Sequence, residues 1–276
     1  MTSTLNTYSS PDGESISEDY RLWVNDIPIH VSTARVSRVP LNQVWPGYQR
    51  PIDQTEIASF AGWDSNGPVE IRIESRQPVE KVAVNPASLD IQPAVNGNFI
   101  TFRMPSPAYA TVEVNGTHGA LHLFASPPEM TPGKPDTLYF APGVHHPGII
   151  DLQSDQTAHI AGGAVVYGSF RARDAENIRI YGRGILDQSE LVREDGVGGI
   201  SMYGCKNVLV EGIIIRDPNV WTVTFAGCRN IHIDGIKLIG LWRYNADGID
   251  LVNTQNALIE NCFIRSFDDS IVLKGF

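Results

Sequence analysis

The stretch Asn230-Ile-His-Ile-Asp-Gly235 is one of four copies of a six-residue template, Asn-apolar-x-apolar-x-Gly/Asn. The other copies begin at Asn177, Asn207 and Asn256, so successive copies lie 30, 23 and 26 residues apart (207 − 177, 230 − 207 and 256 − 230). A repeat of this length is typical of a solenoid coil, and the alternation of apolar residues with period 2 indicates strands. The sequence therefore predicts a right-handed parallel β-helix whose equivalent residues form columns about 4.8 Å apart.

The leading asparagines of the four copies fall in one column of this β-helix. An amide side chain can bond to the coils above and below, so we expect an internal asparagine ladder at a bend. The Gly or Asn five residues later suits a left-handed turn. Cys205 and Cys228 each precede a ladder asparagine by two residues. We expect these two to be buried free thiols that act as small apolar residues.

The sequence before the repeats has a different pattern. Between Tyr20 and Pro127, short alternating segments are separated by Asn-Gly, Asn-Asp and Pro turn signals, which is typical of an antiparallel β-sandwich. We expect Trp23 or Trp63 in its core. The predicted organisation is a mobile polar arm at 1–18, a β-sandwich at 19–130 with a Pro-rich linker at Ser126–Asp136, and a β-helix at 131–276. The fold class is thus all-β.

A second set of strands follows the repeats. These strands are predicted at 198–204, 221–227, 247–253 and 269–275. Aligning their apolar residues places Gly198, Trp221, Asp247 and Asp269 in one column, with steps of 23, 26 and 22 residues (221 − 198, 247 − 221 and 269 − 247). Asp247 and Asp269 then become neighbours across one coil, and Asp268 lies beside them.

Three converging carboxylates raise one another's pKa and destabilise the fold, which points to a purpose in chemistry. Hydrolysis of a glycosidic bond needs one carboxylic acid to protonate the leaving oxygen and one carboxylate to activate water. If side chains alternate strictly between the two faces of each strand, Asp247 and Asp269 face the core and Asp268 faces water. The three can act together only if the chain bends before these strands, and we expect Gly248 to be the pivot.

The segments Asn245-Ala-Asp247-Gly-Ile-Asp and Asp268-Asp269-Ser-Ile-Val-Leu-Lys274-Gly resemble conserved blocks of the polygalacturonase-like enzymes of glycoside hydrolase family 28. The resemblance covers about residues 139–276. It implies a pectin-lyase-like β-helix and hydrolysis of pectic polygalacturonate chains with inversion. It also implies that Asp268 is the general acid and that Asp247 and Asp269 position and deprotonate the attacking water. We expect Asn245, Trp221 and Lys274 to bind the substrate.

Other functions remain open at this point. A β-sandwich ahead of a β-helix is similar to glycoside hydrolase family 49, the dextranase and isopullulanase group, whose substrates are α-glucans. A calcium-dependent polysaccharide lyase could use the same three aspartates as ligands. An inactive β-helix could bind glycan through surface aromatics. The later Gly-His-Gly and Arg-x-Lys blocks of family 28 do not occur before Phe276, so we expect a truncated β-helix whose activity alone is doubtful.

Composition limits the partners. The formal charge of −10 argues against binding to nucleic acid or to an anionic membrane, because either needs a basic face. The expected partner is a polysaccharide or oligosaccharide, with no cofactor and no metal, and the oligomeric state is left open. No apolar signal-peptide core is visible, so the cytoplasm is the default compartment, although a trimmed secreted form has the same pattern.

Overall fold

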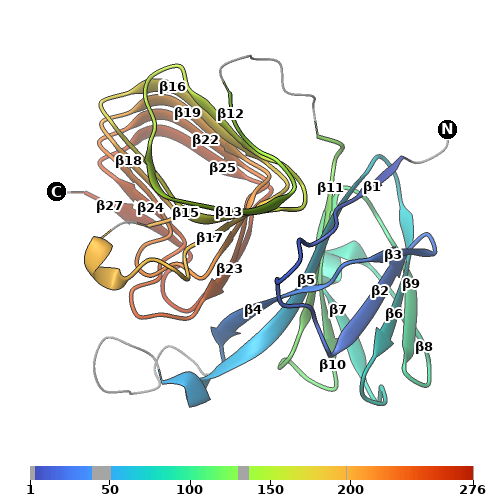
Figure 1. The fold of residues 1–276 in the computed structure, drawn as a ribbon. Helices are drawn as coiled ribbons and strands as arrows, with labels where there is room; N and C mark the ends of the chain where they lie inside the picture. The colour runs from blue at the N-terminus through green and yellow to red at the C-terminus, as the bar shows by residue number, and fades with distance from the viewer. Residues whose placement is uncertain (1–3, 39–50, 130–136, 197, 276) are drawn as a thin grey trace. The chain divides into compact units, whose positions relative to one another are not determined.

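The computed structural model describes residues 4–38, 51–129, 137–196 and 198–275. By its internal contacts the chain divides into two units, one formed by residues 1–34 and 56–130 and the other by residues 35–55 and 131–276. Among the described residues, no helix has the length and apolar character that crossing a membrane requires. In both units the regular secondary structure is almost entirely strand, which confirms the all-β prediction (Figure 1).

The first unit is a sandwich of two sheets. One sheet has the order β1 (Leu5–Thr7), β5 (Thr55–Ser65), β11 (Leu121–Ser126), β10 (Ala108–Val114) and β7 (Val82–Asn85), and β4 (Ser32–Ser37) also pairs with β5. The other has the order β3 (Ile27–Ile29), β2 (Tyr20–Val24), β6 (Val69–Ser75), β9 (Phe99–Met104) and β8 (Ala94–Asn96), and the 3-10 turn η2 spans Ala87–Leu89. Trp63 is buried in the core, as predicted for Trp23 or Trp63.

Two features of this unit differ from a simple antiparallel sandwich. β11 pairs with β5 in parallel. This pairing is possible because the two strands are distant in sequence and are not joined by a hairpin. Strand β1 lies within the polar arm and pairs with β5, so Leu5–Thr7 belong to the sheet. Residues 35–55, which include the 3-10 turn η1 (Ile52–Gln54), group with the second unit. Most of the predicted linker, residues 130–136, lies outside the described residues.

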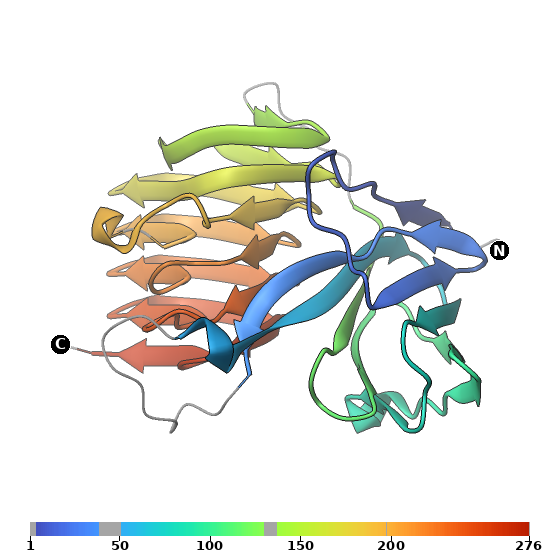
Figure 2. The same cartoon turned by 60° about the horizontal axis from the view of Figure 1, so that its bottom comes forward.

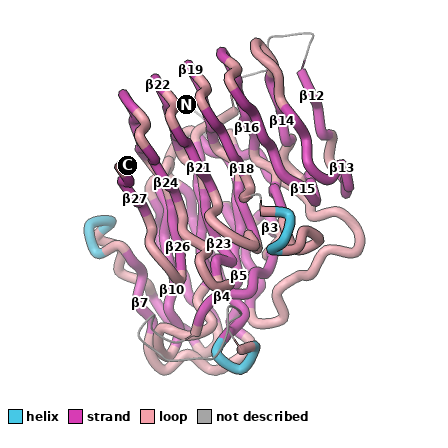
Figure 3. Tube along the Cα trace, turned by 90° about the vertical axis from the view of Figure 1, so that its left-hand side faces the viewer, coloured by secondary structure: helices cyan, strands magenta, loops and turns pink. Residues whose placement is uncertain are grey.

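The second unit is the predicted right-handed parallel β-helix (Figure 2). Its six-stranded sheet has the order β12 (Thr137–Phe140), β14 (Thr157–Ile160), β16 (Glu176–Gly182), β19 (Lys206–Glu211), β22 (Arg229–Asp234) and β25 (Gln255–Glu260). All five pairings in this sheet are parallel. The last four strands carry the four copies of the template, so each copy is one coil (Figure 3).

The other ten strands form a sheet that branches at a long strand, β15 (Ala164–Arg173). β13 (Gly143–Asp151) pairs with β15. One branch continues through β17 (Ile185–Asp187), β20 (Ile214–Arg216), β23 (Lys237–Leu241) and β26 (Phe263–Ser266). The other continues through β18 (Ile200–Tyr203), β21 (Val223–Ala226), β24 (Ile249–Val252) and β27 (Ile271–Lys274). The second branch carries the strands predicted to follow the repeats.

The core of the β-helix is made of stacked apolar columns. Ile178, Val208 and Ile231 are partners in successive coils, and all three are buried. This stacking packs similar side chains above one another without gaps, because each coil repeats the strand register of the previous one. The thiols of Cys205 and Cys228 are free and buried, as predicted, and belong to the same core.

The asparagine ladder forms as predicted, but on the surface. The side-chain amide of Asn256 donates to Asn230, that of Asn230 to Asn207, and that of Asn207 to Asn177, at 3.0–3.2 Å. Each of the four asparagines has a φ between +54° and +60°. The prediction of an internal ladder was wrong because the residue after the asparagine turns inward, as the buried Ile178, Val208 and Ile231 show in the first three copies, which leaves the asparagine facing solvent at the corner.

We predict that Asn230→Ala lowers the free energy of unfolding by about 1–3 kcal/mol, because it removes two hydrogen bonds and places alanine in a left-handed conformation. Asn230→Gly should be at least as stable as Asn230→Ala, since glycine adopts positive φ without steric strain. Urea unfolding measures both. Lys206→Ala, at an exposed position beside the ladder, is the control and should change stability by less than about 0.5 kcal/mol. Equal stability of Asn230→Ala and wild type would contradict a stabilising ladder.

Candidate active site

The predicted acidic column is present in the β-helix. Val223 pairs with Ile200 on one side and with Ile249 on the other, and Ile249 pairs with Ile271. Extending this register by two residues places Trp221, Asp247 and Asp269 above one another. The backbone hydrogen bonds agree, because the Thr222 N–H donates to the Asp247 carbonyl and the Gly248 N–H donates to the Asp269 carbonyl.

The chain bends just before β24. This bend is needed because strict alternation would otherwise place Asp247 on the inward face with Ile249 and Leu251. Asn245 has a φ of +61°, and the regular strand begins only at Ile249. Gly248 lies so close to the next coil that an added Cβ would be 2.3 Å from the Ser270 carbonyl oxygen. Any larger residue at this position would therefore separate the two coils. The bend brings the Asp247 side chain to the same side of the strand as Asp250.

Lys274 on β27 joins the two carboxylates. Its Nζ lies 2.8 Å from Asp250 Oδ1 and 3.6 Å from Asp247 Oδ2. Asp250 is fully buried and Asp247 is 4% exposed. Nζ also lies 3.5 Å from the centroid of the Trp221 ring, which adds a cation–π contact. One ammonium thus contacts two buried carboxylates and an aromatic face.

Among the described residues, the second oxygen of each buried carboxylate, Asp247 Oδ1 and Asp250 Oδ2, has no hydrogen-bond partner. The pKa of Asp247 is raised to about 6, mainly by burial and also by the negative charges of Asp250, Asp268 and Asp269, while the Lys274 ammonium lowers it. Burial also raises the pKa of Asp250, against the effect of its hydrogen bond with Lys274. Asp247 is therefore a carboxyl group that changes its charge close to neutral pH.

Asp268 and Asp269 lie in the turn between β26 and β27. Asp268 is half-buried, and its Oδ1 accepts a hydrogen bond of 3.0 Å from the backbone N–H of Asp269. Asp269 is exposed. The Ser266 hydroxyl donates to the Asp268 carbonyl oxygen, which fixes the turn. The structure thus gives one buried and two more accessible carboxyl groups that act on one another through their charges.

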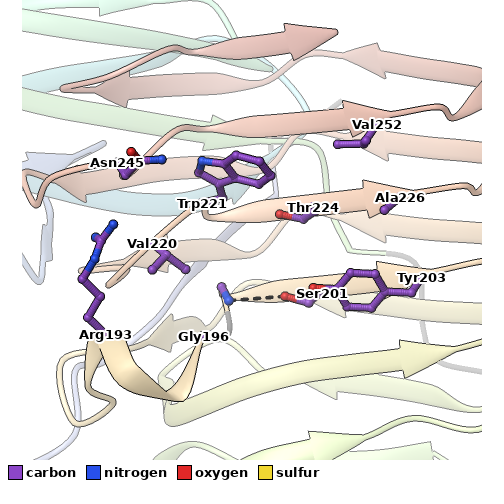
Figure 4. A pocket seen from close by; sticks show the side chains of 11 residues that line it. Arg193, Gly196, Ser201, Tyr203, Val220, Trp221, Thr224, Ala226, Asn245 and Val252 are labelled. Carbon is purple, nitrogen blue, oxygen red and sulfur yellow. Dashed lines mark hydrogen bonds between the residues drawn. The ribbon is translucent and has the colours of Figure 1, made fainter. Parts of the chain in front are cut away.

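A pocket of about 420 Å³ opens on the outer face of the branch β18, β21 and β24 (Figure 4). Its wall consists of the outward-facing residues of these strands, which are Ser201, Tyr203, Thr224, Ala226 and Val252. Arg193, Val220, Trp221 and Asn245 line it from the preceding turns. Thr224 pairs with Asp250, so the wall of the pocket continues directly into the acidic cluster. The four aspartates themselves are not among the eleven residues that line the pocket.

Of the predicted substrate-binding residues, Asn245 and Trp221 both line the pocket, and Figure 4 shows them close together. Trp221 is half-buried, and the Lys274 ammonium lies over its ring. Lys274 itself contacts Asp247, Asp250 and Trp221. Its contacts are therefore those of a residue that organises the site.

Three residues of this region were missed by the sequence analysis. Asp250 and Tyr203 face outward because they alternate with core residues of their strands, and this alternation could have identified them. Arg193 belongs to the 3-10 turn η3 (Arg193–Asp195), and its Nη1 donates to the carbonyl oxygens of Tyr244 and Asn219. No sequence periodicity governs this irregular turn, so no signal could have identified Arg193.

A calcium site was the alternative use of the aspartates. Within the described part of the chain, the one group of three side chains whose ligand atoms all lie within 4.8 Å of one another is His232, Asp234 and Glu260. These residues lie on the six-stranded sheet, apart from the strands of the acidic cluster. The arrangement of the three predicted aspartates therefore adds no support to a calcium-dependent lyase.

The comparisons with known proteins concern the family and the fold. Residues 194–275 match the model of the glycosyl hydrolases family 28. This family 28 segment contains Asp247, Asp250, Asp268, Asp269 and Lys274. The match covers 82 of the 276 residues (275 − 194 + 1) and supports the predicted glycoside hydrolase. Among curated protein sequences, none matches the chain significantly.

Several solved structures match the chain, and the match to Dex49A shows a similarity in fold. Dex49A from Penicillium minioluteum has a TM-score of 0.69 at 17% identity, and the match covers 93% of this chain and 67% of Dex49A. A hyperthermoactive exopolygalacturonase from Thermotoga maritima has a TM-score of 0.45 at 24% identity, covering 50% of this chain and 47% of that enzyme. A family 28 exopolygalacturonase from Yersinia enterocolitica has a TM-score of 0.43 at 14% identity, covering 98% and 63%. The chain thus spans about two thirds of Dex49A and less of the two exopolygalacturonases.

We predict that Asp247→Asn stabilises the fold more at pH 7 than at pH 4. The pKa of about 6 in the folded state lies above the usual value near 4, so wild-type stability falls as pH rises through this interval. The variant lacks this loss, and its advantage should grow by about 1–3 kcal/mol between the two pH values. Urea unfolding at both pH values measures the difference. A difference that does not change with pH would show that Asp247 titrates normally.

Proposed function

We propose that the chain carries the acidic site of an inverting polysaccharide hydrolase, in which Asp268 is the general acid and Asp247 and Asp269 bind and deprotonate the attacking water. The observation that carries the proposal is the family 28 segment itself, in which a buried carboxylate, two more accessible carboxylates and a pocket adjoin one another. The family match supports the class of reaction. The roles of the three aspartates rest on their burial and charges.

The environments of the carboxyl groups fit different roles. Asp247 has an unpartnered buried oxygen and a pKa raised to about 6, which suits a base that accepts a proton near neutral pH. Asp268 is half-buried in the turn before β27, which leaves its carboxyl group accessible for protonating a leaving oxygen. Asp269 is exposed and can hold the water between them. Inversion needs two separated carboxyl groups with room for this water.

For the substrate, we propose a pectic polygalacturonate-type chain, which is the substrate class that the sequence resemblance implies. An α-glucan is the second candidate. It is favoured by the composition of the pocket wall, where Arg193 is the one charged residue among eleven that line the pocket. A chain of uronates would require more positive charge close to these carboxylates than the pocket lining supplies.

We predict that Asp268→Asn lowers kcat by about 10²–10⁴-fold on the preferred polysaccharide, because it removes the proton that the leaving oxygen requires, while KM changes little. Asp174→Asn is the matched control. Asp174 is an exposed aspartate of the same unit with a φ of +50°, a conformation that asparagine tolerates, so this variant should keep wild-type activity. The assay uses the protein expressed from its complete reading frame. Full activity of Asp268→Asn would remove Asp268 from the mechanism.

The class of reaction and the substrate are tested together on polygalacturonate, dextran and pullulan. We expect new reducing ends in the presence of a chelator, with the anomeric configuration inverted when the first product is followed by NMR. Ultraviolet absorbance from unsaturated products that disappears with the chelator would instead identify a lyase. Cleavage of the neutral polymers alone would replace polygalacturonate by an α-glucan as the substrate.

A further inference from the structure

Lys274 occupies a position that its sequence context does not explain. It lies on β27, and its side chain reaches back toward the two preceding coils to contact Asp250 and Asp247 on one coil and Trp221 on the next. The Lys274 side chain is 26% exposed, whereas the side chains of Asp247 and Asp250 are almost fully buried. A lysine that binds substrate would present its donors to the pocket, but this ammonium is shared between two carboxylates.

The contacts of Lys274 bring one positive charge together with two negative ones. One ammonium faces two buried carboxylates, and one oxygen of each carboxylate lacks a hydrogen-bond partner. The ionic contact to Asp250 is short, at 2.8 Å, and the one to Asp247 is longer, at 3.6 Å. Asp250 is therefore neutralised more completely, and Asp247 keeps more of its ability to accept a proton. A buried charge without partners is costly. The position of the Lys274 ammonium between the two carboxylates therefore decides how much each of them is stabilised.

We propose that Lys274 is a positioning residue that favours the ionised form of the Asp247 carboxylate and orients it toward the water attacking the glycosidic bond, while Asp250 competes for the same ammonium. The inference rests on the proposed function of Asp247 as a base. Trp221 takes part indirectly, because its ring lies 3.5 Å from Lys274 Nζ and favours the ammonium at this position. Asp250 pairs with the same ammonium and so weakens the stabilisation that Lys274 gives to the Asp247 carboxylate.

The charged groups that act on Asp247 come from its own strand, from β27 and from the turn before β27. Asp250 lies on the same strand, β24. Lys274 lies on β27, and Asp268 and Asp269 lie in the turn before it. The preceding coil presents Trp221 and Thr224, which carry no charge. Lys274 is thus the positive charge that acts on Asp247, against three negative ones.

Two substitutions test the proposal because they act in opposite directions. Lys274→Met removes the positive charge and keeps most of the side-chain volume, so the acid limb of the kcat/KM profile should move to higher pH by about one unit or more. Asp250→Asn removes the competing negative charge, so the acid limb should move to lower pH. KM should change by less than about twofold in both variants, because neither side chain binds substrate. Lys274→Arg keeps the charge and should retain the wild-type profile.

The controls separate this role from others. Lys206→Met, at an exposed lysine of the same unit, should leave the profile unchanged. If Lys274→Met does not fold, as judged by circular dichroism, Asp250→Asn alone decides the direction of the shift. A raised KM with an unmoved acid limb in Lys274→Met would make Lys274 a substrate-binding residue and overturn the proposal. Shifts of both variants in the same direction would overturn it as well.

Failure of the inference differs from failure of the proposed function. If Asp247→Asn and Asp268→Asn both keep full activity, the proposed function is wrong whatever the Lys274 variants do. If those two variants are inactive and Lys274→Met keeps the wild-type pH profile, the aspartates are catalytic and the inference about Lys274 alone is wrong.

Discussion

The hydrogen bonds between successive coils are the interaction on which the rest of the β-helix depends. They hold each coil in register with the next, so a residue chosen at one position automatically has a counterpart one coil away. The apolar columns, the asparagine ladder and the acidic column are all consequences of this one constraint. Stacking therefore allows side chains that are more than 20 residues apart in sequence to act as neighbours.

The site arises where this regularity is interrupted. Inside the strands, alternation separates buried residues from exposed ones, and carboxylates have no place in the core. At Asn245 the backbone turns through a positive φ, and Asp247 leaves the inward column to share a lysine with Asp250. A short irregular segment between two regular strands thus places a buried acid beside an open pocket. The close approach at Gly248 keeps the interrupted coils packed together.

Sequence reasoning succeeded where periodicity carries information. The register of Trp221, Asp247 and Asp269 followed from the spacing of the apolar residues, because a solenoid offers few other alignments. The ladder was predicted with the correct partners and on the wrong side of the chain, since the spacing fixes the column but not the direction of the bend. The pairing of β5 with β11 and the position of Arg193 depend on contacts between distant or irregular segments, which no local pattern encodes.

The asparagine ladder also has a direction. Every amide donates toward the N-terminal coils, and the series ends where Asn177 donates to the carboxylate of Asp155 at 2.9 Å. Aligned amides polarise one another, so the row acts as an electric dipole along the axis of the β-helix. Its positive end rests on a negative charge, much as an acidic residue does at the start of an α-helix. A fold whose described residues form no α-helix thus contains a surface dipole with a carboxylate cap.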